Sequence, residues 1–323
     1  MPCYKPLDAF YKEGSKPTFK RVSYKQEQIS LPCGRCIGCR LERSRQWAVR
    51  CLHEAKLHDE NCFITLTYDD ENVPWDNGLR ISHFQKFMKR LRKKLNGNKK
   101  QFIEINGQKV ENDEYKKVRF YHCGEYGERF KRPHYHACLF GWEPKDKKLF
   151  KEANGVRIYT SEYLDKVWGM GFTTVGEVTF ESAGYVARYI LKKINGKEKE
   201  KMDPETGLRI YERVDIQTGE IVEVQPEYTT MSRRPGIGKE WFDKYKDDVY
   251  PSDELIVNSR ITRPPRFYDD LYQIENDVVF REIKEERRRQ QRDNKWNETR
   301  ERLKVREKVK NAQINFLKRN EVD

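Results

Sequence analysis

The tight connection between two strand-like segments constrains the fold of this chain more than any other feature. Residues 118–123 read Val-Arg-Phe-Tyr-His-Cys and residues 134–140 read His-Tyr-His-Ala-Cys-Leu-Phe, and both are typical of buried strands. Parallel neighbours need a crossover of about a dozen residues or more, usually with a helix, and the glycine-containing connection at residues 124–133 is too short for one. The two strands are therefore antiparallel. The helical patterns around them indicate an α+β fold, with a central antiparallel sheet and flanking helices.

Other segments add elements to this hairpin. β-Branched and aromatic runs predict strands at residues 62–68 and 172–179. Apolar residues at helical spacing predict helices at residues 40–58, 83–95, 163–167 and 182–194, the second and the last beginning at Ser82 and Ser182. We expect a cysteine-rich segment with a helix at residues 1–60, a central domain at residues 61–250 with a hairpin insertion at about residues 200–228, and a charged tail at residues 251–323, helical or partly disordered.

The charge of the chain favours a polyanionic partner. The formal net charge is +13, and lysine and arginine gain free energy by displacing counterions from phosphates. A basic but otherwise ordinary protein is the alternative. No apolar run approaches the roughly 20 residues that span a bilayer, so we expect no membrane partner. Without a secretory signal, the eight cysteines indicate a reducing compartment, where clustered thiols suggest a metal site rather than disulfides.

Two histidines form the sharpest candidate site. His134 and His136 are two apart on a predicted strand and so point to one face, while Tyr135 points to the other. Such a pair alone is more often unrelated surface or core histidines than a ligand pair. The hairpin also places Glu125 near them, and two imidazoles with one carboxylate leave metal positions open for a substrate oxygen. Glu128 competes as the third ligand, although a solvated turn residue is the favoured interpretation for it.

A second candidate is the run from Gly184 to Lys193. Tyr185 and Tyr189 lie one helical turn apart and share a face. Taken alone, two tyrosines packing at a surface is the more common situation. A tyrosine hydroxyl needs help to act as a nucleophile at neutral pH, because its pKa is about 10. A metal polarising a scissile phosphate, with Lys192 and Lys193 close by, would favour such chemistry.

Three further features can be interpreted as binding sites, and each also has a purely structural interpretation. Cys33, Cys36 and Cys39 have ligand-like spacing, and Cys3 would complete a four-thiolate structural Zn²⁺ site; a compact glycine turn with reduced thiols is the alternative. The adjacent Arg233 and Arg234, in a glycine loop, are candidate contacts to a DNA backbone or part of an ordinary turn. Exposed aromatic rings can stack on unpaired bases, but core packing is expected for each of the three candidates, Tyr126, Trp168 and Phe172.

Several motifs occur in one order along the chain. These are Phe63-Ile64-Thr65-Leu66-Thr67-Tyr68, then His134-Tyr135-His136, then Tyr185 with Tyr189. Their order resembles the HUH endonuclease superfamily of rolling-circle initiators. More narrowly, the cysteine loop, Gly124-Glu125-Tyr126-Gly127, Arg132-Pro133-His134-Tyr135-His136 and the run from Met231 to Gly238 are similar to replication initiators of gokushovirus-like microviruses, a group of small bacteriophages. The resemblance covers about residues 30–245.

The resemblance implies a fold, an activity and partners. The sheet would be related to the RNA-recognition fold. His134, His136 and Glu125 would hold Mg²⁺ or Mn²⁺, and Tyr185 or Tyr189 would attack single-stranded origin DNA. The products would be a 5′-phosphotyrosine link and a free 3′-OH that primes a host DNA polymerase. The sequence has no Gly-rich phosphate loop ending in Gly-Lys-Ser or Gly-Lys-Thr, so we expect a host helicase to unwind the DNA, in the cytoplasm of a bacterial host.

Two other functions fit part of the sequence. One is a non-enzymatic, zinc-dependent nucleic-acid-binding protein that uses the cysteine loop and the basic tail. The other is a relaxase- or transposase-like relative that applies the same chemistry to a plasmid or mobile element. In the tail itself, residues 281–310 alternate basic and acidic side chains, which favours a solvated helix or weak coiled coil over a DNA-binding or partner-binding segment.

Overall fold

The fold was analysed in a computed structural model of the chain. The structure describes residues 3–12, 15–105, 108–127, 130–153, 155–189 and 200–316. By their internal contacts, these residues fall into two units. Unit 2 comprises residues 47–246, and unit 1 combines residues 1–46 with residues 247–323. The N-terminal segment and the tail, which the sequence suggests as separate parts, therefore share one unit. No helix in the described residues is long and apolar enough to cross a membrane.

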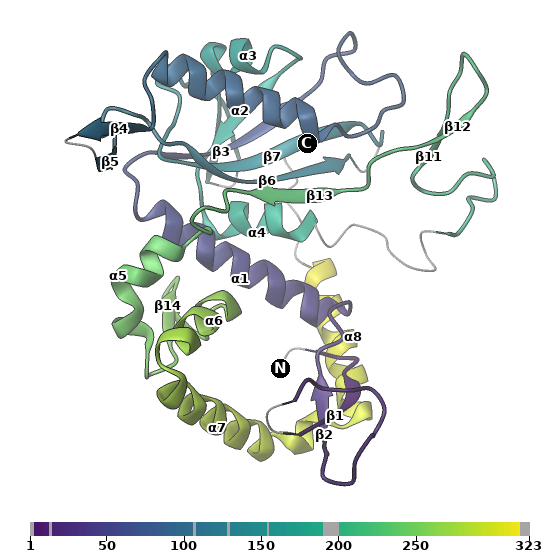
Figure 1. Ribbon diagram of the computed structural model, residues 1–323. Helices are drawn as coiled ribbons and strands as arrows, with labels where there is room; N and C mark the ends of the chain where they lie inside the picture. The colour runs from purple at the N-terminus through teal and green to yellow at the C-terminus, as the bar shows by residue number, and fades with distance from the viewer. Residues whose placement is uncertain are drawn as a thin grey trace. The chain divides into compact units, whose positions relative to one another are not determined.

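A seven-stranded antiparallel sheet organises unit 2, as the sequence predicts. The strand order is β13-β6-β7-β3-β10-β9-β8 (Figure 1). Their bounds are Asn61–Thr67 for β3, Arg119–Tyr126 for β6, Pro133–Phe140 for β7, Lys148–Ala153 for β8, Val156–Thr160 for β9, Thr173–Gly176 for β10 and Tyr228–Met231 for β13. The hairpin of β6 and β7 sits inside the sheet, flanked by β13 and β3, so the short connection that fixed the fold class also fixes its centre.

Helices cover both faces of this sheet. The helices α2 (Ile81–Asn96) and α3 (Glu162–Trp168) lie over one face, and α4 (Phe180–Tyr189) lies over the other (Figure 1). The second half of α1 (Ile37–Ala55) packs its Ala48 and Cys51 into the same apolar cluster as Ala183 and Val186 of α4. Because strand side chains alternate between faces, Tyr135 enters the cluster beneath α2, and its neighbours His134 and His136 face the α4 side.

Two predicted helix starts are wrong. The helix α2 begins at Ile81, because Tyr135 Oη accepts the N–H of Arg80 at 3.0 Å and so fixes the chain just before the helix. The helix α4 begins at Phe180. There the Thr179 N–H donates to Ser182 Oγ at 2.8 Å and the Ser182 N–H donates to Thr179 Oγ1 at 3.1 Å, which is a capping box with Thr179 as the cap. Ser82 and Ser182 therefore lie inside the first turns.

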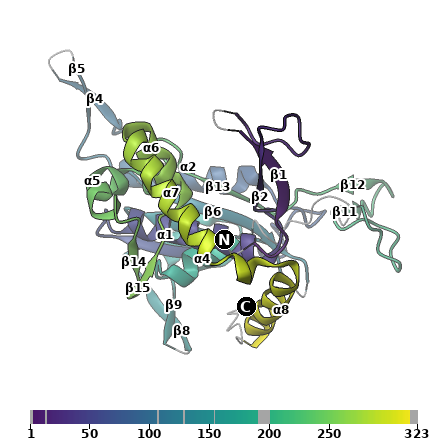
Figure 2. The same cartoon turned by 90° about the horizontal axis from the view of Figure 1, so that it is seen from below.

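Hairpins outside the central sheet account for most of the remaining strands. The pair β4 (Phe102–Ile105) and β5 (Gln108–Glu111) and the pair β11 (Glu212–Val214) and β12 (Ile221–Glu223) project from unit 2 (Figure 2). The second pair is the predicted insertion at about residues 200–228. The first pair was not predicted, because its four-residue strands carry too little apolar pattern to stand out.

Unit 1 is more structured than the sequence suggests. It contains the hairpins β1–β2 and β14–β15, the helix α6, the last residues of α5, and the tail helices α7 and α8 with a short 3-10 helix between them. The strand bounds are Leu7–Tyr11 for β1, Glu27–Leu31 for β2, Leu255–Val257 for β14 and Arg260–Thr262 for β15. The helix bounds are Lys239–Val249 for α5, Arg266–Glu275 for α6, Asp277–Asp293 for α7, Lys295–Glu298 for the 3-10 helix and Arg300–Phe316 for α8. Phe280, Ile283 and Leu303 are buried, so part of the charged tail packs rather than being solvated on every side.

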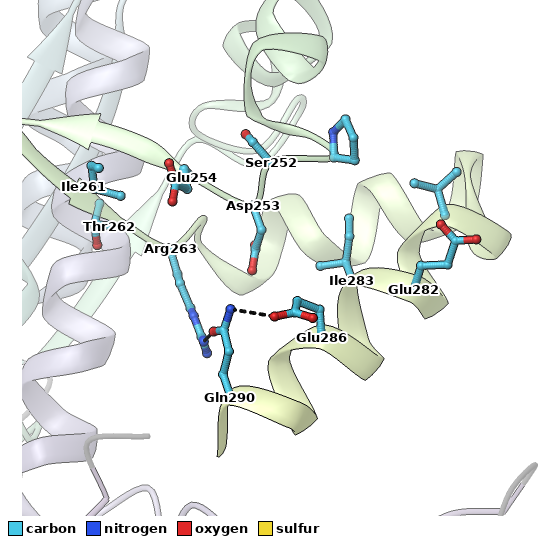
Figure 3. Close-up of a pocket in the computed structure, with 12 residues that line it drawn as sticks. Ser252, Asp253, Glu254, Ile261, Thr262, Arg263, Glu282, Ile283, Glu286 and Gln290 are labelled. Atoms are coloured by element: carbon cyan, nitrogen blue, oxygen red, sulfur yellow. Dashed lines mark hydrogen bonds between the residues drawn. The ribbon is translucent and has the colours of Figure 1, made fainter. Parts of the chain in front are cut away.

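An ion network and a cavity lie between α7 and the β14–β15 hairpin. The guanidinium of Arg287 binds Asp253, with Nε at 2.7 Å from Oδ2, and Asp269, with Nη1 at 2.8 Å from Oδ2. A cavity of about 450 Å³ opens beside it (Figure 3). On its wall, Arg263 donates to Gln290, and Gln290 donates to Glu286. All lining residues come from unit 1, between Pro251 and Gln290.

We predict that His53 makes unit 2 acid-sensitive. Its buried ring stacks on Trp241 at a centroid distance of 3.5 Å. Burial and then the nearby Lys56 lower the pKa of His53 to about 3, below the unfolded value of about 6.5. The unfolded state therefore binds more protons between these pH values, and stability is lost as the pH falls from about 6.5 towards 3, by about 2 kcal/mol at pH 5. The free energy of unfolding is measured in urea at pH 7 and at pH 5. Between these two pH values it should fall less for His53→Phe than for the wild type. Equal losses in the two proteins would contradict this account.

Candidate active site and metal centres

Strand register brings three predicted metal ligands together. In the ladder between β6 and β7, Glu125 lies directly opposite His134, and Cys123 lies opposite His136. Directly opposed residues point to the same face of the sheet, which here is the α4 face. Glu125 belongs to β6, which extends to Tyr126, and not to the turn that the sequence suggests. Gly124 lies within this strand, and a Cβ there would come within 2.8 Å of the Tyr228 ring, so a larger residue would have to displace that ring.

The ligand atoms converge closely. Glu125 Oε1 lies 2.6 Å from His134 Nε2 and 2.8 Å from His136 Nε2. On its far side, His136 Nδ1 is 3.0 Å from Thr65 Oγ1, and His134 Nδ1 is 3.2 Å from the carbonyl oxygen of Arg132. Partners of this kind on the second ring nitrogen hold metal-binding imidazoles in a fixed orientation.

The chemistry of this donor set fits a divalent cation. The roles of the two ring nitrogens of His134 depend on the tautomer: with a proton, Nε2 donates to Glu125 Oε1, and without one, its lone pair is available to a cation. Two acceptors at 2.6 Å repel each other unless a proton or a metal ion lies between them. Burial raises the pKa of Glu125, but the bonds from His134 and His136 outweigh that effect and hold the pKa below its usual value, so the carboxylate stays ionised at neutral pH.

Tyr185 lies beside these ligands. It projects from α4, and its ring centroid is 5.0 Å from that of His136, with the two planes at 89°. Phe63 of β3 contacts both rings: it is roughly parallel to His136 at a centroid distance of 5.6 Å and meets Tyr185 edge-on at 6.3 Å. The buried Ala183, Val186 and Ala187 hold α4 against the sheet, so the position of Tyr185 is set by packing on either side of it along the helix.

The other predicted residues either lie elsewhere in the structure or fall outside the described residues. Arg233 and Arg234 are exposed in the loop after β13, which pairs near the start of β6, whereas Glu125 lies near the end of that strand. Tyr189 is the last residue of α4, and its side chain lies outside the described residues, as do Glu128, Lys192 and Lys193. Of the three aromatic candidates, Tyr126 and Trp168 are buried, but Phe172 is 43% exposed, so core packing is wrong for Phe172.

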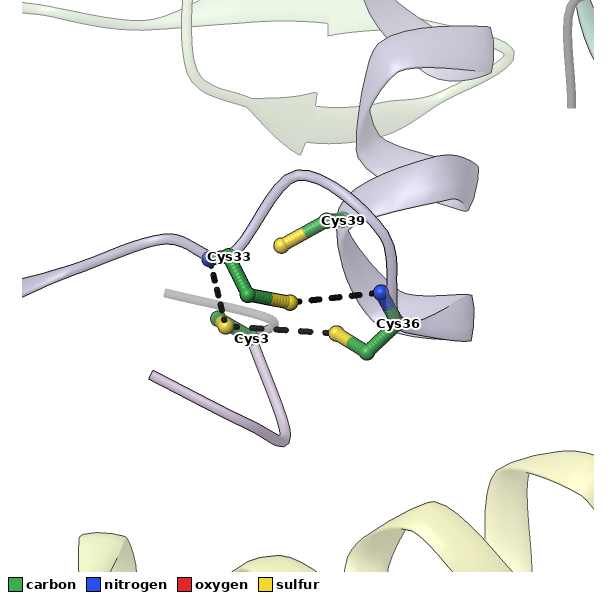
Figure 4. A group of neighbouring side chains, drawn as sticks. All are labelled: Cys3, Cys33, Cys36 and Cys39. Carbon is green, nitrogen blue, oxygen red and sulfur yellow. Dashed lines mark hydrogen bonds between the residues drawn. The ribbon is translucent and has the colours of Figure 1, made fainter. Parts of the chain in front are cut away.

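The four predicted cysteine ligands form a cluster in unit 1. The sulfur atoms of Cys3, Cys33, Cys36 and Cys39 all lie within 4.8 Å of one another (Figure 4). All four thiols are free, and Cys3 Sγ is 3.9 Å from Cys36 Sγ, far longer than a disulfide bond of about 2.05 Å. A tetrahedral zinc site with Zn–S bonds of about 2.3 Å has sulfur–sulfur edges of about 3.8 Å, which agrees with this spacing.

Backbone amides point at these sulfurs. Cys36 Sγ accepts the N–H of Tyr4 at 3.2 Å, Cys33 Sγ that of Cys36 at 3.2 Å, and Cys3 Sγ that of Cys33 at 3.3 Å. Burial raises the pKa of the Cys36 thiol, but amides of Cys39 and Tyr4 lower it to about 7. Burial raises the pKa of Cys3 and of Cys39, because removal from water disfavours the charged thiolate. The arrangement of this cluster is therefore compatible with a bound metal ion.

Comparison with known proteins identifies the family. A family model described as replication-associated protein ORF2/G2P matches residues 61–194. Replication-associated protein VP4 of Bdellovibrio phage phiMH2K is 32% identical over 277 residues, which are 84% of this chain and 77% of the phage protein. This chain belongs to the family of phage replication-associated proteins. The resemblance to initiators of gokushovirus-like microviruses is thereby confirmed.

Two further relatives agree with this assignment. Replication-associated protein ORF2 of Spiroplasma virus 4 is 30% identical over 83% of this chain and 79% of its own length. Replication-associated protein ORF4 of Chlamydia phage 1 is 35% identical over 52% of this chain and 40% of its own length. No solved structure matches this chain. The family model covers both histidines, Glu125 and Tyr185, whereas the cysteine cluster lies outside the matched residues.

The residues that support the two histidines are not recognisable from the sequence. Thr65 orients His136, and Phe63 stacks on it. The carbonyl of Arg132 orients His134, and the Arg132 guanidinium is itself held by Asp70 at 2.6 Å. The alternation of Phe63, Thr65 and Thr67 along β3 places all three on one face, but only the pairing of β3 with β7 shows that this is the histidine face.

We predict that Glu125 is the third metal ligand. Glu125→Gln keeps the shape of the side chain but removes the charge, and should weaken Mn²⁺ binding at least tenfold by isothermal titration calorimetry. Glu128→Gln, the matched change at the competing carboxylate, should leave the affinity within about twofold. The opposite ranking would transfer the role to Glu128. Unchanged binding in both variants would show that the third ligand is neither carboxylate.

Proposed function

We propose that this protein is a metal-dependent tyrosine endonuclease that nicks and rejoins single-stranded origin DNA to initiate rolling-circle replication of a phage. The convergence of Glu125, His134 and His136, with the Tyr185 ring 5.0 Å from His136, carries the proposal. The relatives supply the biological setting, because their names place them in phage replication. The protein would act inside a bacterial host.

Each side chain has a distinct task in this proposal. A Mg²⁺ or Mn²⁺ ion held by these ligands would polarise the scissile phosphate and stabilise the charge that develops on it. Glu125 keeps both imidazoles oriented through its Oε1 atom, and Thr65 and the Arg132 carbonyl orient the same rings from behind. Phe63 and the α4 packing limit where the Tyr185 ring can go, so that its hydroxyl reaches the substrate from one side.

The covalent step balances without a further reagent. Tyr185 Oη forms a bond to the phosphorus, the P–O3′ bond breaks, and the 5′ phosphate remains on the tyrosine. The phenolic proton passes to solvent, and the departing 3′ oxygen takes up a proton to become the 3′-OH. That hydroxyl would prime a host DNA polymerase while a host helicase unwinds the duplex. Since the phosphotyrosine ester keeps the energy of the broken bond, attack by a 3′-OH reverses the step and rejoins the strand.

Tyr189 would provide the second nucleophile. Its position at the end of α4, one turn after Tyr185, places its backbone on the same side of the helix. Two tyrosines allow a second cut while the first remains linked to DNA, and ligation then releases a circle. Lys192, Lys193, Arg233 and Arg234 remain proposed contacts to the DNA backbone.

The nuclease is tested by nicking of single-stranded origin DNA with Mn²⁺. The wild type should form a covalent protein–DNA band that survives denaturing gel electrophoresis. Tyr185→Phe should reduce the band at least a hundredfold if Tyr185 acts first, and the double variant with Tyr189→Phe should abolish it. Tyr163→Phe, which removes a hydroxyl from α3 on the other face of the sheet, should cut normally. A band that persists in the double variant would exclude both tyrosines, and binding without cleavage by the wild type would favour the non-enzymatic function.

We also propose that the cysteine cluster binds a structural Zn²⁺ ion. The purified protein should contain about one zinc per chain by mass spectrometry, as expected for a closed four-thiolate site. Cys36→Ser should lose the metal and lower the thermal midpoint, because Tyr4 and Leu303 pack around these sulfurs. Cys62→Ser, at a buried thiol outside the cluster, should retain the zinc. A metal-free wild type that unfolds at the same temperature with or without a chelator would refute this site.

A further inference from the structure

Two exposed phenylalanines lie together in unit 2. Phe172 is 43% exposed and Phe150 is 60% exposed, and their ring centroids are 5.7 Å apart. Large aromatic rings usually bury most of their surface, and a pair that remains open to solvent commonly marks a binding surface. The position of this pair in the sheet suggests what it binds.

Strand register places Phe172 on the face that carries the metal ligands. Thr173 pairs with Leu66 and points into the α2 side, so the preceding residue points to the α4 side. Phe172 lies opposite Thr67, whose N–H donates to the Phe172 carbonyl at 3.0 Å, and Thr67 in turn pairs with His134. Phe172 and His134 therefore share one row across the sheet, two strand spacings or roughly 10 Å apart.

The backbone beneath Phe172 is held in place. Its carbonyl also accepts the hydroxyl of Thr67 at 2.7 Å, and the Asp69 N–H donates to the Met170 carbonyl at 3.1 Å. Between them, Gly171 has a φ of +136°, and a Cβ there would lie 2.4 Å from the Asp69 nitrogen. A side chain does not fit at that position. Phe172 thus projects from a fixed backbone, so little conformational entropy is lost when a ligand stacks on its ring.

Phe150 reaches the same surface from the edge strand β8. The pairing of β8 with β9 shifts between Leu149 and Lys151, so Phe150 is the extra residue of a β-bulge. Bulges redirect a side chain at a sheet edge, and here the redirected ring meets Phe172. Lys148 and Lys151 flank Phe150 in the strand, and because Lys148 is paired with Glu162 at 2.8 Å, the exposed Lys151 contributes most to favouring a negatively charged ligand over a neutral one.

We propose that Phe172 and Phe150 form an aromatic platform on which unpaired bases stack, next to the cleaved phosphate of the DNA strand. This rests on the proposed nuclease function, because the strand must cross the sheet face that carries His134. Every base has an aromatic face, so the platform would tolerate many sequences and would hold the strand in place rather than read it. The combination of flat apolar rings and flanking lysines matches unpaired nucleotides better than a purely apolar protein segment.

Binding measured without cleavage tests the platform. A fluorescein-labelled single strand of mixed sequence is titrated with full-length protein in buffer without Mg²⁺ or Mn²⁺ and without a chelator, so that the proposed structural Zn²⁺ stays in place, and anisotropy reports the affinity. Phe172→Leu and Phe150→Leu should each weaken binding about 5- to 100-fold, the range expected for loss of one stacked base. The dependence of affinity on salt should not change, since no phosphate contact is removed. Phe172→Trp, which keeps an aromatic face, should bind nearly as well as the wild type.

Phe102→Leu is the matched control. Phe102 is also 43% exposed and belongs to unit 2, but it lies on the β4–β5 hairpin outside the central sheet. This variant should bind like the wild type. The platform is refuted if Phe172→Leu and Phe150→Leu bind within about twofold of Phe102→Leu, or if the wild type does not bind single strands at all.

The platform and the nuclease can fail separately. If Tyr185→Phe with Tyr189→Phe still cleaves, the nucleophile assignment fails, while a loss of affinity in Phe172→Leu still supports the platform. If cleavage requires the tyrosines but both phenylalanine variants bind normally, the nuclease stands and the platform is wrong. A strand with abasic sites around the cleaved phosphate gives an independent readout. The wild type and Phe172→Leu should have the same weak affinity for this abasic strand. A difference in affinity that persists between them would contradict base stacking.

Discussion

The antiparallel pairing of β6, β7 and β3 is the constraint on which the candidate site depends. Its register sets Glu125 opposite His134 and His134 opposite Thr67, and it sets His136 opposite Thr65. Because side chains alternate along a strand, a slip of one residue would send every one of these groups to the α2 face. Tyr135 resists such a slip, since its buried ring and hydroxyl are held on the α2 side by Tyr68 at 2.7 Å and by Arg80.

Both clusters share one electrostatic feature. In each cluster, atoms that carry lone pairs or negative charge lie closer together than the same groups would stay if they were free in water. These are a carboxylate with two imidazoles in unit 2, and four thiols in unit 1. The surrounding fold supplies the energy that holds them, through strand pairing in one case and backbone amides in the other. Each cluster is thus a region where a bound cation would relieve repulsion and stabilise the fold at the same time.

The sequence carried enough information for the central fold and for the composition of both clusters. Short-range patterns sufficed for this, such as the tight hairpin and the spacing of His134 and His136. These short-range patterns do not show which segments, distant in the sequence, lie side by side in the fold. Thr65 acquires its role only because β3 lies beside β7, and the exposure of Phe172, just before β10, likewise depends on how the chain packs around it. The start of α2 was missed for the same reason, since the hydroxyl of Tyr135, distant in sequence, fixes the chain ahead of this helix.

The discontinuous make-up of unit 1 has a consequence for synthesis. Its cysteine cluster joins Cys3 and Cys36 to Leu303 on α8, across almost the whole length of the chain. During translation, the N-terminal residues leave the ribosome long before their packing partner exists, whereas unit 2 is contiguous and has its own apolar clusters. The sheet can therefore form while the peptide is still growing, whereas the apolar packing around the cysteines is completed only after α8 emerges.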